Sequence, residues 1–250
     1  MYKRQDQGSK RIDRSGETTL NQFDTHAIEA AMQIREGGGA DVDEIVAVTM
    51  APSEAGRTLN KAVALGADRS VHLTDDALAG SDVCATGYAL AKVLESESPD
   101  LVLLGQQSDD GECYTIGAVV ADHLKMPSLT QVIKIDVEGG KLRCERQAEY
   151  GYDTVDVELP AVIAVGDAIN EPRYPSLKAI MGAKKKTLDT KAAGDVGIEA
   201  DRVGEQGSRT QVLAINPPAE KAGGEIIEDE DTNETVEKIV AWLDERKLLA

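Results

Sequence analysis

The chain has 250 residues, enough for one large domain or for one domain with an extension, and 41% of them are hydrophobic. Because it contains a single Phe and a single Trp, its core must be built from Val, Ile, Leu and Ala, which is typical of a parallel sheet covered by helices. The formal net charge of -18 excludes general binding of nucleic acid, since such a surface would repel a phosphate backbone.

The acidity itself has two interpretations, and composition leaves both open. An excess of carboxylates keeps a protein soluble. It is also tolerated in a salt-rich cytoplasm, where counterions screen the repulsion between like charges.

The three cysteines, Cys84, Cys113 and Cys144, form no C-x-x-C pair, so neither a metal site nor a redox dithiol is predicted. A sparse and odd number of cysteines indicates a reducing compartment. No apolar run reaches the length of a membrane span, and the polar N-terminus does not resemble a signal peptide. We therefore expect a cytoplasmic protein without membrane insertion.

Helical and extended patterns alternate through the first half of the chain. The predicted elements are, in chain order, a helix over residues 24–36, a buried strand over 44–49, a helix that Ser53 caps, a strand over 69–73, a helix over 83–94, a buried strand over 100–105 and a helix over about 114–124. Asp24 is the expected N-cap of the first helix. This alternation predicts parallel βαβ units, and therefore an α/β fold with a doubly wound, mostly parallel sheet.

The pattern changes at residue 129. Residues 130–137 and 141–147 flank Glu138-Gly139-Gly140, which predicts an antiparallel hairpin, and two further strands are expected around Pro160. Beyond them we expect a basic cluster at 184–186, a loose stretch over 189–209, an acidic linker at 228–231 and an amphipathic helix over 232–249. We divide the chain into a poorly patterned N-terminus (1–20), a nucleotide-binding domain (21–188) and a C-terminal arm (189–250).

The loop over residues 105–117, between the second buried strand and the next helix, is the most informative segment. Ligands bind at this edge of a parallel sheet, because loop amides and the N-terminus of the following helix face outward together. Glycines in the loop allow close approach of the backbone, and hydroxyl groups come from Ser108, Tyr114 and Thr115. The spacing matches neither G-x-G-x-x-G nor a Walker loop, so a nucleotide site and an acidic surface loop both remain open.

Residues 167–181 form a second candidate segment. Pro172 and Pro175 stiffen it, and its apolar side chains stand beside Arg173 and Lys178, which is typical of a protein-docking loop. The alternative is a connecting loop whose apolar residues pack on the domain.

The histidines, His26, His72 and His123, lack metal-ligand spacing, so we interpret them as structural and predict no metal. Neither a nucleophile elbow nor a zinc-protease motif is present. We predict no catalytic residue.

Four segments resemble the electron transfer flavoprotein beta family. They are N-Q-F-D-T-H-A-I-E-A-A at 21–31, like the family's N-P-F-D-E-x-A-x-E-E-A; A-V-A-L-G-A-D-R at 62–69, like its A-L-A-M-G-A-D-R; the loop at 105–117, like its G-x-Q-x-x-D-x-D/E-x-x-Q-x-G; and N-E-P-R-Y-P-S-L at 170–177 with A-K-K-K at 183–186, which is nearly the family signature. The resemblance covers about residues 21–186, and its fourth segment is the most specific.

The resemblance implies a Rossmann-like adenine-nucleotide-binding fold and a heterodimer with an alpha subunit that holds most of the redox FAD. This subunit would bind AMP or a second FAD. It would be an electron carrier rather than an enzyme, accepting electrons from dehydrogenases, such as acyl-CoA dehydrogenases, and passing them to a quinone oxidoreductase.

Matching positions assign residues to each role. The nucleotide would be lined by Asn21, Gln22, Phe23, Asp24, Met50, Gly105, Gln106, Gln107, Ser108, Asp109, Asp110, Gly111, Glu112, Cys113, Tyr114, Thr115 and Ile116, with Phe23 near the alpha-bound flavin. Partner docking would fall to Arg173, Tyr174, Leu177, Ile180 and Met181.

Two departures from the family pattern affect these expectations. Family members open with a strand such as M-K-I-L-V-x-V-K, whereas this chain begins M-Y-K-R-Q, so we expect its sheet to lack a strand that is usually central. In the loop, Thr115 and Tyr114 replace the usual residues, Asp110-Gly111-Glu112 resembles the bifurcating type and Cys113 the AMP type. A stand-alone adenine-nucleotide-binding regulator is the alternative; an adenylating hydrolase ranks last, since no S-G-G-x-D-S loop is found.

Overall fold

The computed structural model describes residues 5–13, 16–218, 223–224, 226–228 and 231–249. Contacts divide the chain into two compact units, residues 1–213 and residues 214–250. In the first unit, the segment predicted to be poorly patterned contains a small antiparallel hairpin, β1 (Gln5–Asp6) and β2 (Arg11–Ile12). Residues 1–4 and 14–15 of that segment lie outside the described residues.

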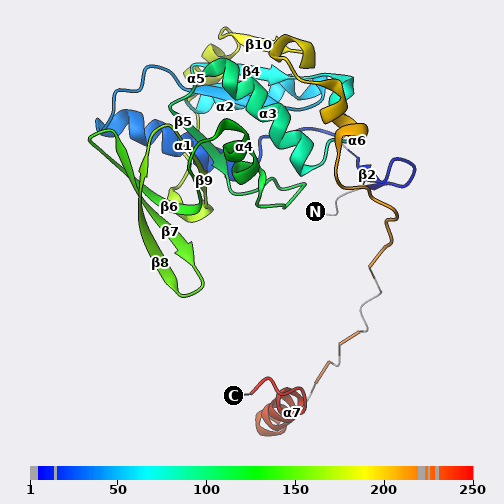
Figure 1. Cartoon of the computed structure of the whole chain (residues 1–250). Helices are drawn as coiled ribbons and strands as arrows, with labels where there is room; N and C mark the ends of the chain where they lie inside the picture. The colour runs from blue at the N-terminus through cyan, green and yellow to red at the C-terminus, as the bar shows by residue number, and fades with distance from the viewer. Residues whose placement is uncertain (1–4, 14–15, 219–222, 225, 229–230, 250) are drawn as a thin grey trace. The chain divides into compact units, whose positions relative to one another are not determined.

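Helices and strands alternate beyond this hairpin (Figure 1). They are α1 (Gln22–Gly37), β3 (Val46–Met50), α2 (Gly56–Leu65), β4 (Arg69–Leu73), α3 (Val83–Glu97), β5 (Leu101–Gly105) and α4 (Ile116–Leu124). The predicted α/β class and the order of these elements are confirmed.

Two predicted caps are wrong. Helix α1 begins at Gln22 with Asn21 in the N-cap position, so Asp24 lies in the first turn. Ser53 begins a separate 3-10 turn, η1 (Ser53–Ala55), and caps no helix.

The strands form a three-stranded sheet, β10-β4-β3, and a five-stranded sheet, β5-β9-β6-β7-β8. The later strands are β6 (Ser128–Glu138), β7 (Lys141–Ala148), β8 (Gly151–Glu158), β9 (Ala161–Val165) and β10 (Leu188–Lys191). Strands β3, β4 and β10 are mutually parallel, as are β5, β9 and β6, whereas β6, β7 and β8 pair antiparallel. The predicted hairpin is confirmed, and both glycines of its turn, Gly139 and Gly140, have positive φ values of 59° and 82°.

Helices cover both faces of the parallel strands. In β9, Val162 packs with residues of α3 and α4, whereas Ile163 and Val165 pack in the cluster that includes Ala27 of α1. Helix α3 also packs on the first sheet, where Tyr88 and its neighbours contact Val71 and Leu73, while α2 covers the opposite face. One layer of strands between two layers of helices is the doubly wound arrangement.

Strands β3 and β5 are the facing edges of the two sheets. Val48 of β3 and Leu104 of β5 pack in one apolar cluster, yet no described strand joins them. Every residue of β3 is half-buried, whereas every residue of β9 is buried. The expectation that a central strand is lacking stays a prediction.

The prediction of a loose stretch over residues 189–209 is wrong. Strand β10 pairs with β4, and two 3-10 turns, η4 (Ala193–Val196) and η5 (Ala200–Arg202), and helix α6 (Gly204–Gly207) follow it. Carboxylates from the sheet region hold this segment: Asp75 accepts a hydrogen bond from the amide of Ala193 (3.1 Å), and Asp82 from that of Arg209 (2.8 Å).

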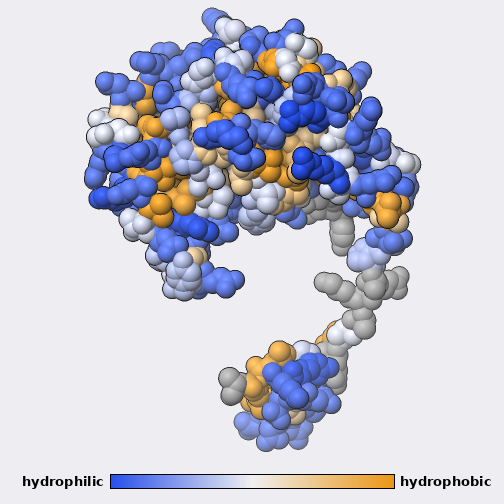
Figure 2. All heavy atoms as spheres, viewed as in Figure 1, coloured by the Kyte–Doolittle hydropathy of each residue, from blue (hydrophilic) through white to orange (hydrophobic). Residues whose placement is uncertain are grey.

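The second unit contains helix α7 (Thr232–Glu245), which ends before the predicted residue 249. None of its residues is buried, and its apolar stripe, which includes Val236, Ile239 and Val240, is exposed. Residues 229–230 of the predicted acidic linker lie outside the described residues. Hydrophilic side chains dominate the face seen in Figure 2, with apolar patches between them. Among the described residues, no helix has the length and apolar character needed to cross a membrane.

Candidate functional site

The loop that follows β5 is fastened to the first turn of α1. The side-chain amide of Asn21 donates to the backbone oxygen of Gln107 (2.8 Å), and its oxygen accepts from the amide of Asp109 (3.0 Å). The amide of Gln22 donates in turn to the carboxylate of Asp109 (3.3 Å). The structure thus brings the predicted residues of the 21–24 segment together with the predicted loop.

Asp24 reinforces the junction at the end of β5. Its carboxylate accepts from the amide of Gly105 (2.8 Å) and from the side chain of Asn21 (3.0 Å). Burial raises the pKa of Asp24 and the charge of Asp109 adds to the rise, while the two hydrogen bonds oppose it. The hydrogen bonds of this buried carboxylate thus connect α1 to the start of the loop.

Gly105 is required by the closeness of α1. A Cβ atom at this position would lie 2.5 Å from the Cβ of Phe23 and 2.8 Å from the backbone nitrogen of Asp24. Only a residue without a side chain allows the helix to approach this strand end.

The outer part of the loop is a compact, exposed turn. The hydroxyl of Ser108 accepts from the amide of Gly111 (3.1 Å), and the thiol of Cys113 donates to the backbone oxygen of Gly111 (3.1 Å). Glu112 and Tyr114 both adopt left-handed conformations, with φ of 48° and 55°. The turn presents backbone and hydroxyl groups to solvent.

Two polar features at this loop lack the partners that such groups usually have. Within the described structure, the side-chain oxygen of Gln107 is buried without a hydrogen-bond partner. At the start of α4, Thr115 occupies the N-cap position, but its side chain makes no capping hydrogen bond. Amides of an uncapped helix N-terminus attract an anion such as phosphate, and a buried carbonyl requires a donor. A nucleotide could supply both groups.

Three of the predicted nucleotide-site residues contribute to the frame. The amide of Gln106 continues the pairing of β5 with β9 by donating to Val165 (2.9 Å). Ile116 packs in the cluster beneath α4. Met50 ends β3, in the other sheet, and packs with the cluster around Leu73.

The predicted docking segment leaves β9 through the 3-10 turn η3 (Asp167–Ile169) and ends in helix α5 (Leu177–Ala183), which Ser176 caps through the amide of Ala179 (3.1 Å). Its apolar side chains are exposed: Tyr174 is 97%, Leu177 74%, Met181 64% and Ile180 43% accessible. These fractions contradict the alternative in which they pack on the domain. The four residues are called the docking surface below.

Arg173 differs from the other residues predicted for docking, because its guanidinium binds α1. It donates to both carboxylate oxygens of Glu29 (2.7 and 2.9 Å) and to both of Glu36 (2.7 and 2.8 Å). These hydrogen bonds hold the pKa of Glu29 and of Glu36 below the usual range.

Sequence reasoning missed the anchors of this segment on α1. Glu29 is buried, and the ring of His26 lies 3.1 Å from two oxygens of Asn170, whose amide donates to the backbone of His26 (3.0 Å). The opposite charges of Arg173 and Glu29, which belong to two different family segments, were the only signal from which this ion pair could have been predicted.

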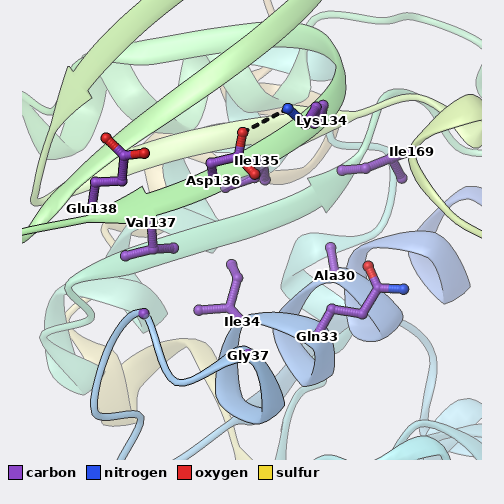
Figure 3. Close-up of a pocket in the computed structure, with 11 residues that line it drawn as sticks. Ala30, Gln33, Ile34, Gly37, Lys134, Ile135, Asp136, Val137, Glu138 and Ile169 are labelled. Atoms are coloured by element: carbon purple, nitrogen blue, oxygen red, sulfur yellow. Dashed lines mark ion pairs between the residues drawn. The ribbon is translucent and has the colours of Figure 1, made fainter.

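A separate hollow of about 520 Å³ lies between α1 and β6 (Figure 3). Ile34 and Val137 point toward each other across it, Ile135 also lines it, and Asp136 pairs with Lys134 at its edge (2.7 Å). Its lining includes none of the predicted site residues, so it does not form part of the candidate nucleotide site.

The histidines have structural contacts. His72 is buried with Nε2 3.0 Å from the backbone oxygen of Ala51, and His123 stacks edge-on against Tyr88. No group of three or more His, Cys, Asp or Glu that could hold a metal occurs among the described residues.

Comparison with known proteins agrees with the resemblance. The model of the electron transfer flavoprotein domain matches residues 10–196. Electron transfer flavoprotein subunit beta of Mycobacterium bovis is 40% identical over 94% of this chain and 90% of its own length. The same subunit of Megasphaera elsdenii is 34% identical over 89% and 86%, and the caffeyl-CoA reductase-Etf complex subunit CarD of Acetobacterium woodii is 35% identical over 92% and 87%. The chain therefore belongs to the electron transfer flavoprotein beta subunit family.

Proposed function

We propose that this chain is the adenine-nucleotide-binding subunit of a cytoplasmic electron transfer flavoprotein, paired with an alpha subunit that holds most of the FAD. The membership of the family supports an electron-transfer role. The observation that carries the nucleotide assignment is the loop after β5, braced by Asn21 and Asp24, with the buried, unpaired oxygen of Gln107 beside it.

The nucleotide fits the loop by the chemistry of its groups. The uncapped start of α4 suits a phosphate, the oxygen of Gln107 suits a donor such as an adenine amino group or a ribose hydroxyl, and Ser108 offers a hydroxyl. The carboxylates of the loop suit ribose hydroxyls rather than phosphate. AMP and the adenine half of a second FAD satisfy these requirements equally.

The chain's own task is to bind and to orient. The flavin supplies the redox chemistry when bound, and no residue of this chain acts as acid, base or nucleophile. Dehydrogenases, such as acyl-CoA dehydrogenases, donate the electrons, and a quinone oxidoreductase accepts them.

The docking surface receives these protein partners. The four exposed apolar side chains all lie within residues 174–181, on a short helix and its preceding loop, and exposed apolar residues are expected at the centre of a transient interface. Arg173 fixes this surface to α1 through Glu29 and Glu36 and does not itself contact the partner.

Co-expression with an alpha subunit gene tests the proposal. The purified material should contain both chains, and the nucleotides released by denaturation should be counted by chromatography. One FAD and one AMP per heterodimer supports the simple carrier, and two FAD supports the bifurcating type. Purification of this chain alone, without a flavin-bearing partner, would contradict the proposal and favour a stand-alone regulator.

A further inference from the structure

Helix α1 contacts both the nucleotide loop and the docking segment. We propose that Glu29 and Arg173 are positioning residues through which nucleotide binding at the β5 loop stabilises the docking surface. The inference rests on the proposed function, because it requires a nucleotide at the loop.

The first turn of α1 belongs to the nucleotide loop. Four hydrogen bonds join Asn21, Gln22 and Asp24 to the backbone or carboxylates of residues 105–109, at 2.8 to 3.3 Å. A ligand that orders this loop must therefore also order the start of α1.

The next turns of the same helix belong to the docking segment. His26 and Asn170 exchange contacts at 3.0 to 3.1 Å, and the buried carboxylate of Glu29 receives the backbone amide of Arg173 (3.2 Å) in addition to its guanidinium. Arg173 also donates to Glu36, from Nη1 and from Nη2, and it shares Nη2 between Glu36 and Glu29. The backbone immediately before Tyr174 is thereby fixed to the helix.

The attachments of α1 to the nucleotide loop and to the docking segment lie close together on one rigid helix. From Asn21 to Glu29 the helix spans about 12 Å, at about 1.5 Å per residue. A helix transmits order between its turns, since its hydrogen bonds open cooperatively. A second connection runs through the sheet, because β5 and β9 are paired and β9 leads directly into the docking segment.

Thermodynamic linkage makes the coupling reciprocal. If AMP stabilises the closed form of α1 and the docking segment, it raises the affinity for a protein partner by some factor. The bound partner must then raise the affinity for AMP by the same factor. Coupling of this type commonly amounts to about five-fold or more in an equilibrium constant.

Hydrogen exchange measured by mass spectrometry on the full chain, with and without AMP, tests the inference. AMP should slow exchange over residues 105–116, and it should slow exchange over residues 170–181 by about five-fold. In Arg173→Gln, AMP should still protect residues 105–116 but no longer residues 170–181. If the role of Arg173 were purely structural, Arg173→Gln would speed exchange of residues 170–181 by the same factor with and without AMP. AMP would then still protect these residues.

Arg143→Gln is the matched control, because Arg143 also grips a carboxylate, that of Asp156, with two hydrogen bonds on the β7–β8 hairpin. It should behave as the unmodified chain. If Arg173→Gln exchanges rapidly throughout, Glu36→Gln, which keeps the Glu29 contacts, should show a partial loss of the AMP effect. Protection of residues 105–116 alone in the unmodified chain would overturn the inference. Absence of protection at both segments, with AMP and also with FAD, would overturn the proposed function as well.

Discussion

At the scale of single residues, the site depends on contacts whose loss has a definite consequence. Gly105 is the clearest example, since the atoms that a Cβ would meet belong to the backbone of α1 and to the Cβ of Phe23. None of these atoms is at the flexible end of a side chain, so the clash could be relieved only by a shift of the backbone.

Gly105→Ala should therefore destabilise the protein by about 1–3 kcal/mol, the usual cost of overpacking. Equilibrium unfolding in urea provides the measurement. Gly117→Ala is the control, because a Cβ there lies at an ordinary 3.4 Å from the Cβ of Ala164 and falls within helix α4. Equal stability of the Gly105→Ala variant and the unmodified chain would show that α1 does not approach β5 as described.

Glu29 gives the fold a pH dependence of predictable sign. Hydrogen bonds from Arg173 lower the pKa of Glu29 in the folded state, so its contribution to stability is present above the unfolded pKa of about 4.3 and is lost as pH falls through the lower folded pKa. Glu29→Gln should lower the melting temperature at pH 7, and this deficit should shrink as the pH falls below about 4. A deficit that stays constant down to pH 3 would exclude the ion pair as its cause.

At the scale of elements, helix α5 offers a surface rather than a core. Leu177→Ala should leave stability unchanged, because the side chain is 74% exposed, but should slow electron acceptance from a dehydrogenase. The rate of flavin reduction in the assembled heterodimer is the measurement. Leu213→Ala, which removes an equally exposed leucine outside the segment, should leave that rate unchanged. A normal rate in Leu177→Ala would exclude docking through this residue.

Elements with a strong local pattern were predictable from sequence. The apolar run that forms β5 and the alternation around Gly139-Gly140 are encoded by adjacent residues, so β4, β5 and the β6–β7 hairpin appear where expected. Local pattern could not choose between Asn21 and Asp24 as cap, because both suit that role. The choice follows from bonds of Asn21 to Gln107, 86 residues away.

The remaining errors have the same origin in long-range contacts. The order of residues 189–209 comes from β10 pairing with β4 and from Asp75 and Asp82, which the local polar sequence does not reveal. The partner of Glu29, Arg173, lies 144 residues later, so the local sequence does not reveal that Glu29 is paired. Sequence analysis placed the two candidate segments directly after the strands β5 and β9, as the structure does, but it did not predict their common attachment to α1.

At the scale of the whole molecule, charge is the dominant feature. A net charge of -18 produces self-repulsion that the folded chain must tolerate. The ion pairs on its surface include Lys141 with Glu158 and Arg143 with Asp156, but acidic residues outnumber basic ones by 45 to 27.

Raising the concentration of NaCl should therefore increase the melting temperature. The Debye length falls from about 10 Å at 0.1 M to about 3 Å at 1 M salt, which removes most repulsion between surface carboxylates. Calorimetry over this range is the test. A melting temperature indifferent to salt would leave solubility as the explanation of the acidity.

The central claim is that the loop after β5 holds an adenine nucleotide, and calorimetric titration of AMP into the full chain tests it most directly. In Gly111→Val, the new Cβ would lie 2.9 Å from the hydroxyl oxygen of Ser108, inside the loop. Gly194→Val is the matched control, because a Cβ at position 194 meets no atom within 4 Å. We predict one AMP bound per chain, an affinity lower by about ten-fold or more in Gly111→Val, equivalent to about 1.4 kcal/mol, and an unchanged affinity in Gly194→Val. Failure of the unmodified chain to bind either AMP or FAD, or equal affinity for AMP in Gly111→Val, would contradict this account.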